Sequence, residues 1–582
     1  MALDGLFLNQ LLTELDGNLC GAKINRIHQP DKNTITIKLN QFQKGNFTLL
    51  ISCHPQNARI QITEEILTNP QKPPLFAMVL RKHLEGGKIL SLEQQGLDRV
   101  AILHIEGRNE IGEFERKKLI LEIMGKHSNL ILTNEKEEII GAIKQYGSNL
   151  SRYREVLPHA TYKAPPPQNK LNPFLMTEEE YAEQLFQHEL SLPMERAIFQ
   201  TIEGISPQTA AEILNRCGLT GTLLDQAGSF ELQKTFAAIK KLTECEIAPS
   251  IAIKNGKTKD FYFLPLLHLS DEQIACDNLS TLLDLYFGRK ERENAFESRR
   301  RNLEKQIESF RDRLAKKIEK QERELSHAID GENYRRYGEI LSAYIYQVPE
   351  HSAEVMLPDF YQQDTEIAIP LKPELSPAEN AARYFRLYNK AKTARDAIKV
   401  HLSNNREELE YVESLCYAAA NCSSDNDLQE LKREMAVAGY LKESRMTKKE
   451  KGDVPLPPME TEYDGYTILI GRNNKQNDKL TLKTAAKDDL WFHTKDIPGS
   501  HVIIKKKQGQ TIPDEVIAKA AQYAAYYSKA KEADKVPVDY TEVKQVKKPS
   551  GARPGMVIYF EQTTLFVRPE APVIKAPMKK GR

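Results

Sequence analysis

The stretch FESRRRNLEKQIESFRDRLAKKIEKQERELSHAI, residues 296–329, sets the architecture of this 582-residue chain. Its apolar residues recur at spacings of three, four or seven, and charged residues fill the gaps. They are Phe296, Leu303, Ile307, Phe310, Leu314, Ile318, Leu325 and Ile329. This period places one apolar stripe along a long helix, and it predicts that the helix buries the stripe against a partner.

A second amphipathic segment supplies that partner. It begins with SPAENAARYFRLYNKAKTA, residues 376–394, and its stripe continues through Ile398, Leu402, Leu409, Val412 and Cys416 to beyond Leu428. The two helices, joined by residues 331–375, predict an antiparallel coiled-coil arm. With a rise of about 1.5 Å per residue, about 50 residues reach about 75 Å.

The residues before the arm predict two further domains. A helical pattern at 5–16 and a proline-opened helix at 73–87 accompany apolar runs with turn residues between them. These runs lie at 34–40, 47–53, 58–63, 99–107, 117–125, 129–134 and 138–144. They predict an α+β domain with an antiparallel meander, which ends at the proline-rich stretch 162–173.

Residues 177–287 have a helical pattern. Within them MERAIFQTIEGISPQTAAEILNRCG, residues 194–218, predicts two short helices around an EGIS turn, with Pro207 opening the second. This resembles a helix-hairpin-helix, whose turn amides and helix N-terminus can hold a nucleic-acid phosphate. Ser206 replaces one glycine of the usual pattern, so a plain helical hairpin is the favoured interpretation.

The C-terminal part is basic. Residues 441–582 hold 27 Lys and Arg against 18 Asp and Glu, a charge of +9, and the rest of the chain carries −8. The charged, proline-rich stretch 446–458 reads as a linker. A basic domain on a mildly acidic body indicates a polyanionic partner on one side, or else a lysine-rich solubilising surface.

Two segments of this domain suit RNA. Residues 466–485 suggest a strand–turn–strand with regularly spaced cations, and KDDLWFHTKDIPGSH, residues 487–501, places aromatic rings among charges. Cations neutralise phosphates and aromatic rings stack on unpaired bases. The candidate RNA-binding residues are therefore Arg472, Lys475, Lys479, Trp491, His493, Lys505, Lys506 and Lys507. For Trp491 and Phe492, a place in the core is the favoured alternative.

Other chemistries find little support. His493 and His501 lack the spacing of a helical metal-ligand pair, and the chain has no nucleophile-elbow, GxGxxG or Walker pattern. The seven scattered cysteines form no CxxC, which predicts reduced thiols in the cytoplasm. No apolar run approaches the roughly 18 residues of a membrane span, and Asp4 argues against a secretory signal. We expect no catalytic, cofactor or metal site.

Several motifs together resemble the NFACT family of ribosome quality-control factors. They are LDRVAIL (97–103), LEIMGKHSNLIL (121–132), SPAENAARYFRLYNKAKTA, GRNNKQNDKL (471–480) and DDLWFHTKDIPGSHVII (488–504). The resemblance covers nearly the whole chain in the same order. It implies a multidomain α+β protein with an NFACT-N domain at 1–172, a helix-hairpin-helix region at 173–277, a coiled-coil middle domain at 278–440 and an NFACT-R RNA-binding domain at 441–582.

The resemblance also implies an adaptor without enzyme activity. Such an adaptor binds large ribosomal subunits, made of rRNA and ribosomal proteins, that are blocked by peptidyl-tRNA. It recruits alanyl-tRNA there for untemplated alanine tailing, which marks the stalled chain for degradation. The family's Asp-Arg pair matches Asp98 and Arg99, which composition alone would interpret as a solvated turn. A segment near the tRNA-binding face matches Glu122, Ile123 and Met124, although its apolar members suit a core as well.

Two alternatives remain from the resemblance. The NFACT-N domain is similar to the N-terminal domain of formamidopyrimidine-type DNA glycosylases, but their N-terminal proline and glutamate are replaced here by Met1-Ala2-Leu3-Asp4. Family members have also been called fibronectin-binding proteins, so binding of fibronectin at a surface is a secondary possibility, although no anchor signal is present.

Overall fold

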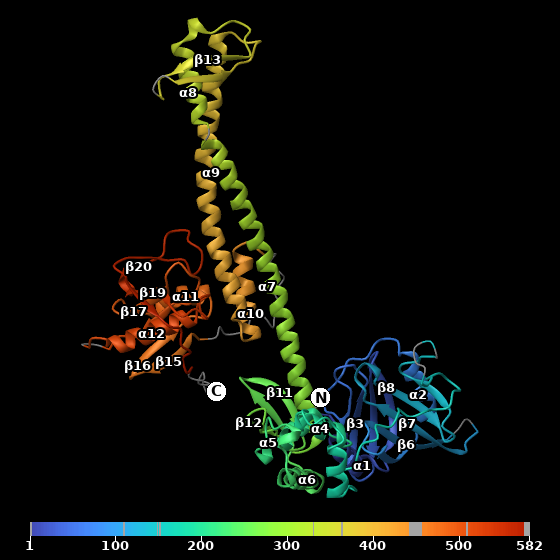
Figure 1. The fold of residues 1–582 in the computed structure, drawn as a ribbon. Coiled ribbons are helices and arrows are strands. Elements are labelled where there is room, and N and C mark those ends of the chain that lie inside the picture. Colours follow the sequence, from blue (N-terminus) through green and yellow to red (C-terminus); the bar gives the residue numbers. More distant parts are fainter. Residues whose placement is uncertain are drawn as a thin grey trace. The chain divides into compact units, whose positions relative to one another are not determined.

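The computed structural model describes residues 3–108, 111–147, 149, 153–329, 331–362, 365–441, 457–507 and 510–574. The chain divides into two compact units, Met1–Asn294 and Ala295–Arg582. Figure 1 traces their elements along the chain. The predicted linker at 446–458 lies outside the described residues except for its last two. In the part of the chain that the structure describes, no helix combines the length and apolar character that crossing a bilayer requires.

The first unit is built on a nine-stranded antiparallel sheet of order β4-β3-β2-β1-β5-β6-β7-β8-β9. Its strands are β1 (Lys23–Asp31), β2 (Thr34–Gln41), β3 (Gly45–Ser52), β4 (Arg59–Ile62), β5 (Lys88–Gln94), β6 (Val100–Arg108), β7 (Phe114–Glu122), β8 (Asn129–Asn134) and β9 (Ile139–Ala142). Helices α1 (Gly5–Leu19) and α2 (Leu75–Leu84) pack on it. The sequence patterns indicated both helices and seven strands but missed β1 and β5.

The rest of this unit is mostly helical. Its helices are α3 (Glu178–Leu185), α4 (Met194–Thr201), α5 (Pro207–Cys217) and α6 (Ser229–Glu244). A three-stranded sheet of order β11-β10-β12 follows, formed by β10 (Ser250–Lys254), β11 (Lys257–Tyr262) and β12 (Glu272–Ala275). The helical pattern expected over all of 177–287 is therefore wrong for residues 245–278, because the buried β-branched run of β10 pairs on both sides, and helix resumes only at Leu279.

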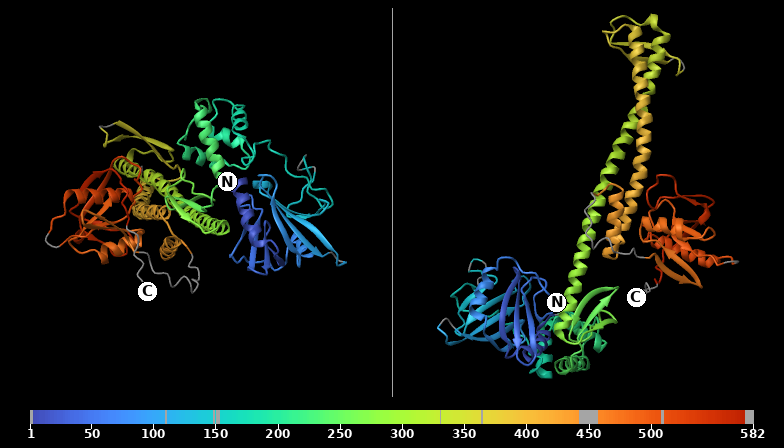
Figure 2. Two further views of the ribbon diagram at one scale, coloured as in Figure 1. Left: turned by 90° about the horizontal axis from the view of Figure 1, so that it is seen from below. Right: turned by 180° about the vertical axis from the view of Figure 1, so that it is seen from behind.

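The two long helices predicted from the apolar stripes are α7 (Leu279–Ile329) and α9 (Pro377–Ala420). They lie side by side in all three ribbon views (Figures 1 and 2). Residues 317–322 of α7 contact residues 405–406 of α9, and residues 299–300 contact the chain at 420–425. Residue numbers rise along one helix as they fall along the other, so the pair is antiparallel.

The connection between the long helices is a small subdomain. It consists of α8 (Glu332–Ala343), β13 (Glu354–Asp359) and β14 (Thr365–Pro370), which pack around their own apolar cluster. After α9 a shorter helix, α10 (Asp425–Val437), folds back and packs against it. The single helix expected to beyond Leu428 is therefore wrong in its last part, since α9 ends at Ala420. No pattern in the sequence predicted the two strands, which are short and partly exposed.

The C-terminal domain is a six-stranded antiparallel sheet of order β15-β16-β18-β17-β19-β22, with α12 (Asp514–Tyr526) packed on one face. Its strands are β15 (Met459–Tyr463), β16 (Tyr466–Ile470), β17 (Leu490–Thr494), β18 (Val502–Ile504), β19 (Val536–Glu542) and β22 (Thr563–Val567), and a separate ribbon pairs β20 (Val546–Lys547) with β21 (Ile558–Tyr559). The expected strand–turn–strand at 466–485 is wrong, since β16 leads into α11 (Asn474–Lys479) and a π-helical turn, Leu480–Thr484.

Candidate nucleic-acid interface

Asp98 and Arg99 lie in the tight turn between β5 and β6. Glu203 holds this turn from the helical hairpin, where its Oε1 accepts a hydrogen bond from the Leu97 N–H at 2.8 Å. Gln94 holds it from the sheet, since its Nε2 donates to the Asp98 carbonyl at 3.0 Å. Two protein segments therefore fix the backbone of the pair before any ligand arrives.

Two glycines permit the close packing around this turn. A Cβ at Gly5, the first residue of α1, would lie 1.9 Å from the Leu97 carbonyl oxygen. Gly204, in the EGIS turn, has φ +76°, and a Cβ there would lie 2.9 Å from Leu97 Cβ. Because only glycine fits at such approaches, α1, the hairpin turn and the Asp98–Arg99 turn form one junction.

The side chains of Asp98 and Arg99 line a pocket of about 240 Å³ at this junction. Gln168 Nε2 donates to Asp98 Oδ1 at 3.2 Å, and Lys170 Nζ lies 4.4 Å from the centre of the Phe199 ring in the same pocket. No ion pair joins Asp98 to Arg99. Among the described residues, the Arg99 guanidinium has no hydrogen-bond or ion-pair partner at all. The turn is therefore not a closed salt bridge.

Burial disfavours the charged forms of both Asp98 and Lys170 in this pocket, and the opposite charges there partly offset its effect. Burial raises the pKa of Asp98, and the hydrogen bond from Gln168 and the charges of Arg99 and Lys170 only partly oppose this effect. Burial likewise lowers the pKa of Lys170, against the attraction of Asp98. A half-buried carboxylate beside two cations offers an acceptor and several donors to one incoming group.

The helical hairpin does not offer its second helix to a phosphate. The Ser206 N–H, at the start of α5, donates to Asp4 Oδ2 at 3.0 Å, and Thr209 Oγ1 donates to the same oxygen. The Tyr262 hydroxyl also donates to the Asp4 carboxylate, whose pKa is raised by its burial. A carboxylate of the protein thus already occupies the place where a phosphate would bind, as in a plain helical hairpin.

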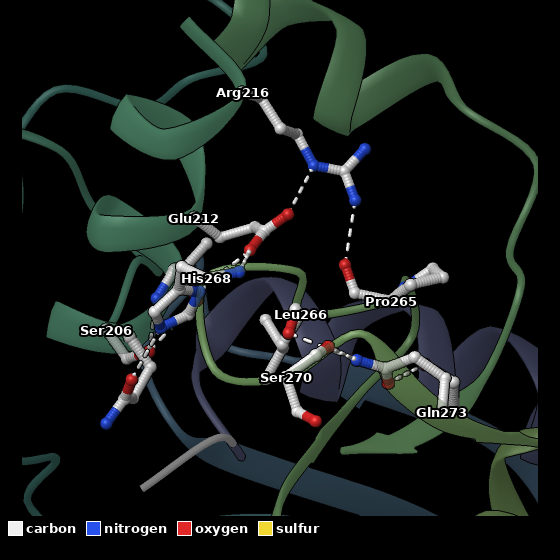
Figure 3. Close-up of polar contacts among 11 residues, drawn as sticks. Ser206, Glu212, Arg216, Pro265, Leu266, His268, Ser270 and Gln273 are labelled. Carbon is white, nitrogen blue, oxygen red and sulfur yellow. Dashed lines mark hydrogen bonds and ion pairs between the residues drawn. The ribbon is translucent and has the colours of Figure 1, made fainter. Parts of the chain in front are cut away.

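Figure 3 shows what fixes α5 in place. Glu212 is buried, and its carboxylate accepts from Arg216 Nε at 2.7 Å and from both the backbone N–H and Nδ1 of His268. Burial alone would raise the pKa of Glu212, but these hydrogen bonds lower it, so the carboxylate stays ionised. Arg216 also donates to the Pro265 carbonyl, which fastens the loop before β12 to the helix.

The segment Glu122–Met124 is mostly interior. The Glu122 carboxylate is fully buried, and it accepts two hydrogen bonds from Arg154 and one from the Tyr162 hydroxyl. Ile123 is fully buried too, whereas Met124 is half-buried beside the exposed Lys126 and His127. Of the three matched residues, only Met124 has surface for an RNA contact in this structure.

In the C-terminal domain, the polar run around α11 fastens the domain to the arm. Asn474 Nδ2 donates to Ser414 Oγ of α9 and to Glu434 Oε1 of α10, and Asn473 Nδ2 donates to Glu430 Oε2. These asparagines are buried. Of the cations in the same stretch, Lys475 and Lys479 are exposed. Arg472 is half-buried, and its Nε donates a hydrogen bond to the Pro457 carbonyl.

Exposed lysines from three segments gather around a buried aspartate. Asp489 Oδ1 accepts from the Lys506 N–H at 2.9 Å, and its carbonyl accepts from the Val543 N–H at 2.9 Å. The Lys544 N–H donates to the Lys487 carbonyl. We call this group the lysine cluster: Lys487, Lys505, Lys506, Lys507 and Lys544. Sequence reasoning picked out Lys505–507 but missed Asp489, whose role depends on contacts with distant strands.

Trp491 and Phe492 are both fully buried, so the core alternative holds for them in this structure. Trp491 packs against the rings of His501 and Tyr559, and no base can stack on it from solvent. His493 is half-buried, with its ring stacked at 5.8 Å on that of Trp491. Burial lowers the pKa of His493, so its ring is neutral near pH 7.

Comparison with known proteins finds matches over nearly the whole chain. Residues 4–453 match the model of the NFACT N-terminal and middle domains, and residues 459–559 match that of the NFACT protein RNA binding domain. The Rqc2 homolog RqcH of Bacillus subtilis is 39% identical over 581 residues, which cover 99% of each chain. The Rqc2 homolog RqcH of Streptococcus suis is 37% identical and covers 99% of this chain and 100% of its own. The fibrinogen binding protein from Staphylococcus aureus, a crystal structure, matches 49% of this chain and 98% of its own at 35% identity, with a TM-score of 0.42.

Proposed function

This chain belongs to the NFACT family, as its motifs predicted, and from that premise we propose that it is a ribosome quality-control factor. It binds large ribosomal subunits that carry peptidyl-tRNA and recruits alanyl-tRNA for untemplated C-terminal alanine tailing of the stalled chain. The support is the match to proteins named as RqcH over the full length of the chain.

One observation carries the tRNA part of this proposal. Asp98 and Arg99 lie in a rigid turn and line the same pocket, and the Arg99 guanidinium has no partner among the described residues. A carboxylate accepts hydrogen bonds from a base edge and a guanidinium donates to one, so the pair can read a base together.

The two RNA-facing surfaces have different tasks in this proposal. The lysine cluster neutralises phosphates of ribosomal RNA without regard to sequence, because exposed ammonium groups attract phosphates but read no base edge. The Asp98–Arg99 pocket selects the tRNA. The chain acts as an adaptor in the cytoplasm with no chemistry of its own, and the ribosome forms the peptide bond.

Sequencing the RNA that co-purifies with the tagged protein tests this proposal. We expect large-subunit rRNA together with one dominant tRNA family, that of alanine. The fraction should also contain peptidyl-tRNA, detected by its release on ribonuclease treatment. Recovery of neither RNA from cells with stalled ribosomes would overturn the proposal.

A further inference from the structure

A second pocket, of about 260 Å³, lies between α9 and the C-terminal domain within the second unit. The lysine cluster and the Asp98–Arg99 turn take no part in it. Side chains of α9, of β17 and its following turn, and of the stretch before and along β21 form its walls. The polar lining includes Glu410, Glu413, Trp491, His493, Asp496 and His501.

Trp491 brings an unsatisfied donor to this pocket. Its side chain is fully buried, yet its Nε1–H has no hydrogen-bond partner in the part of the chain that the structure describes. A buried N–H without a partner costs about 1–3 kcal/mol. Such groups are rare in native proteins, and Trp491 is one of the residues that line the pocket. It calls for a ligand atom that accepts a hydrogen bond.

Other residues that line the pocket supply acceptors. Glu410 and Asp496 line the pocket, and neither has an ion-pair partner among the described residues. Burial raises the pKa of Glu410, and the nearby carboxylates of Glu407, Asp496 and Glu413 raise it further. Glu413 is paired with Lys529 at 3.4 Å. No lysine or arginine is among the described residues that line the pocket, so its field is negative.

The two histidines add no positive charge. Burial lowers the pKa of His493, and it lowers that of His501 still more, with help from the charge of a protonated His493. His501 Nδ1 is hydrogen-bonded to Thr481 Oγ1 at 2.8 Å, which fixes the ring. The walls therefore combine flat neutral rings, one free donor and two free carboxylates.

We infer that this pocket binds a single unpaired nucleobase that carries an exocyclic amino group, held by its edge. The amino group donates to Glu410 or Asp496, and an acceptor atom of the same base accepts from Trp491 Nε1–H. Adenine, cytosine and guanine each offer a donor and an acceptor on one edge. This inference rests on the proposed RNA-binding function, because it adds a base-reading site to the C-terminal domain.

Competing ligands satisfy only part of the site. A phosphate would accept from Trp491 but would meet two carboxylates with no cation beside them. A lysine or arginine side chain would satisfy the carboxylates, but it has no acceptor for the indole N–H. Uracil has no exocyclic amino group, and its single donor, N3–H, lies between two carbonyl oxygens. If N3–H donated to a carboxylate, at least one of these oxygens would be held against that carboxylate and repelled by it.

The fluorescence of Trp491 tests the inference directly, because it is the single tryptophan of the chain. The full-length protein is titrated with adenosine, cytidine, guanosine and uridine, which carry no phosphate, and with arginine amide. N-acetyltryptophanamide in the same solutions corrects for absorbed light. We expect a saturable change with the three amino-bearing nucleosides and none with uridine or arginine amide.

The variant Glu410→Gln with Asp496→Asn should raise the half-saturating nucleoside concentration by about tenfold or more. Both side chains are exposed, so the variant folds. Its control, Asp488→Asn with Glu515→Gln, removes two exposed carboxylates that do not line the pocket and should bind like the wild type. Equal affinity of both variants would overturn the inference.

Two further outcomes would also overturn it. A response to arginine amide without one to nucleosides would assign the pocket to a basic protein segment, and no response to any probe would leave no ligand. Ribosomal RNA binding, measured in parallel, keeps the two proposals apart. Loss of the nucleoside response with intact RNA binding contradicts only the base pocket, whereas loss of RNA binding as well contradicts the proposed function.

Discussion

Arg154 donates hydrogen bonds from both of its terminal nitrogens to the Glu122 carboxylate in the N-terminal domain, and Nη2 lies 2.6 Å from Oε2. The carboxylate is fully buried, and the Tyr162 hydroxyl donates to it as well. A buried carboxylate in this position serves the packing of the sheet against the segment that carries Arg154 and Tyr162. The family match of Glu122 to a tRNA-binding segment therefore needs a test that separates folding from binding.

We predict that Glu122→Ala lowers the free energy of unfolding by about 3–5 kcal/mol, because it leaves the Arg154 guanidinium buried without its carboxylate. Met124→Ala, at the half-buried end of the same segment, should cost much less. Chemical denaturation of both variants measures the difference. If Glu122→Ala unfolds like the wild type and yet loses tRNA, Glu122 contacts tRNA and the structural interpretation is wrong.

Replacing Asp98 and Arg99 together by alanine should abolish tRNA recruitment and alanine tailing while binding of the large subunit survives. Each lost base-reading pair is worth about 1–3 kcal/mol, a factor of about ten to a hundred in affinity. The melting temperature should hardly change, because no ion pair between them is lost and the turn is held by Glu203 and Gln94.

The matched control for this variant is Glu106→Ala with Arg116→Ala. These residues form an exposed ion pair at 3.5 Å on the same sheet, so the control removes the same two charges elsewhere. Co-purifying tRNA and large-subunit rRNA are quantified for both proteins. Equal loss of the two RNAs in the Asp98–Arg99 variant, or loss of neither, would contradict a tRNA-reading role.

For the lysine cluster we predict salt-sensitive, largely sequence-independent RNA binding. Log affinity should fall with log salt by about 0.7 to 0.9 for each phosphate neutralised, and changing Lys505, Lys506 and Lys507 to Glu should flatten that slope. Asp489→Ala should flatten it in part with every lysine still present, since Asp489 positions the backbone of Lys506. Filter binding across a salt series measures both. An unchanged slope in the triple variant would mean that these lysines only solubilise the surface.

Elements could be predicted from the sequence where the spacing of apolar residues alone marks the face that is buried. The stripe from Phe296 to Ile318 and the alternation in β2 are local, and the structure buries the faces that they mark. β1 was not predicted, because one of its buried residues is the polar Gln29 and charged residues and a proline interrupt its apolar alternation. α11 was not predicted, because it has no apolar face. Instead, the buried side-chain amides of Asn473 and Asn474 at its start donate hydrogen bonds to Glu430 and Glu434.

The residues of the candidate site could likewise not be predicted from local sequence patterns alone. Asp98 and Arg99 were found by resemblance, since an adjacent pair of opposite charges carries no functional signal. Gln168, which bonds to Asp98, and Lys170, in the same pocket, come from a stretch some 70 residues later that reads as a proline-rich linker. No local pattern brings residues so far apart together, because their contact depends on how the linker runs across the junction of α1, α5 and the turn.

His501 makes the C-terminal domain sensitive to acid. Burial holds the pKa of His501 well below its usual value, so the folded domain takes up no proton at mildly acidic pH, whereas the unfolded chain does so below about pH 6.5. The unfolded state then binds more protons, and the free energy of unfolding falls as the pH drops below about 6.5, by about 1.4 kcal/mol per pH unit for one such histidine.

His501→Asn should therefore reduce this acid dependence, although it lowers stability at pH 7 through lost packing. Denaturation followed by Trp491 fluorescence between pH 7.5 and about 5 measures the slope. His351→Asn, an exposed histidine of the subdomain between α7 and α9, is the control and should keep the wild-type slope. The explanation fails if the His501 variant and the control show the same dependence on pH.

The antiparallel pairing of α7 and α9 predicts a role that depends on length. Residues 319–325 and 399–405 are heptads that face each other, as the contacts of Gln321 with Asn405 and of Glu322 with Arg406 show. Deleting both keeps the apolar seam in register and shortens the arm by about 10 Å. The end domains should stay folded, but tailing should fall sharply, because a shorter arm cannot let one protein engage subunit and tRNA together.

Lys320→Ala with Glu324→Ala alters the same stretch without shortening it and should tail normally. Wild-type tailing by the shortened protein would show that the arm does not act through its reach.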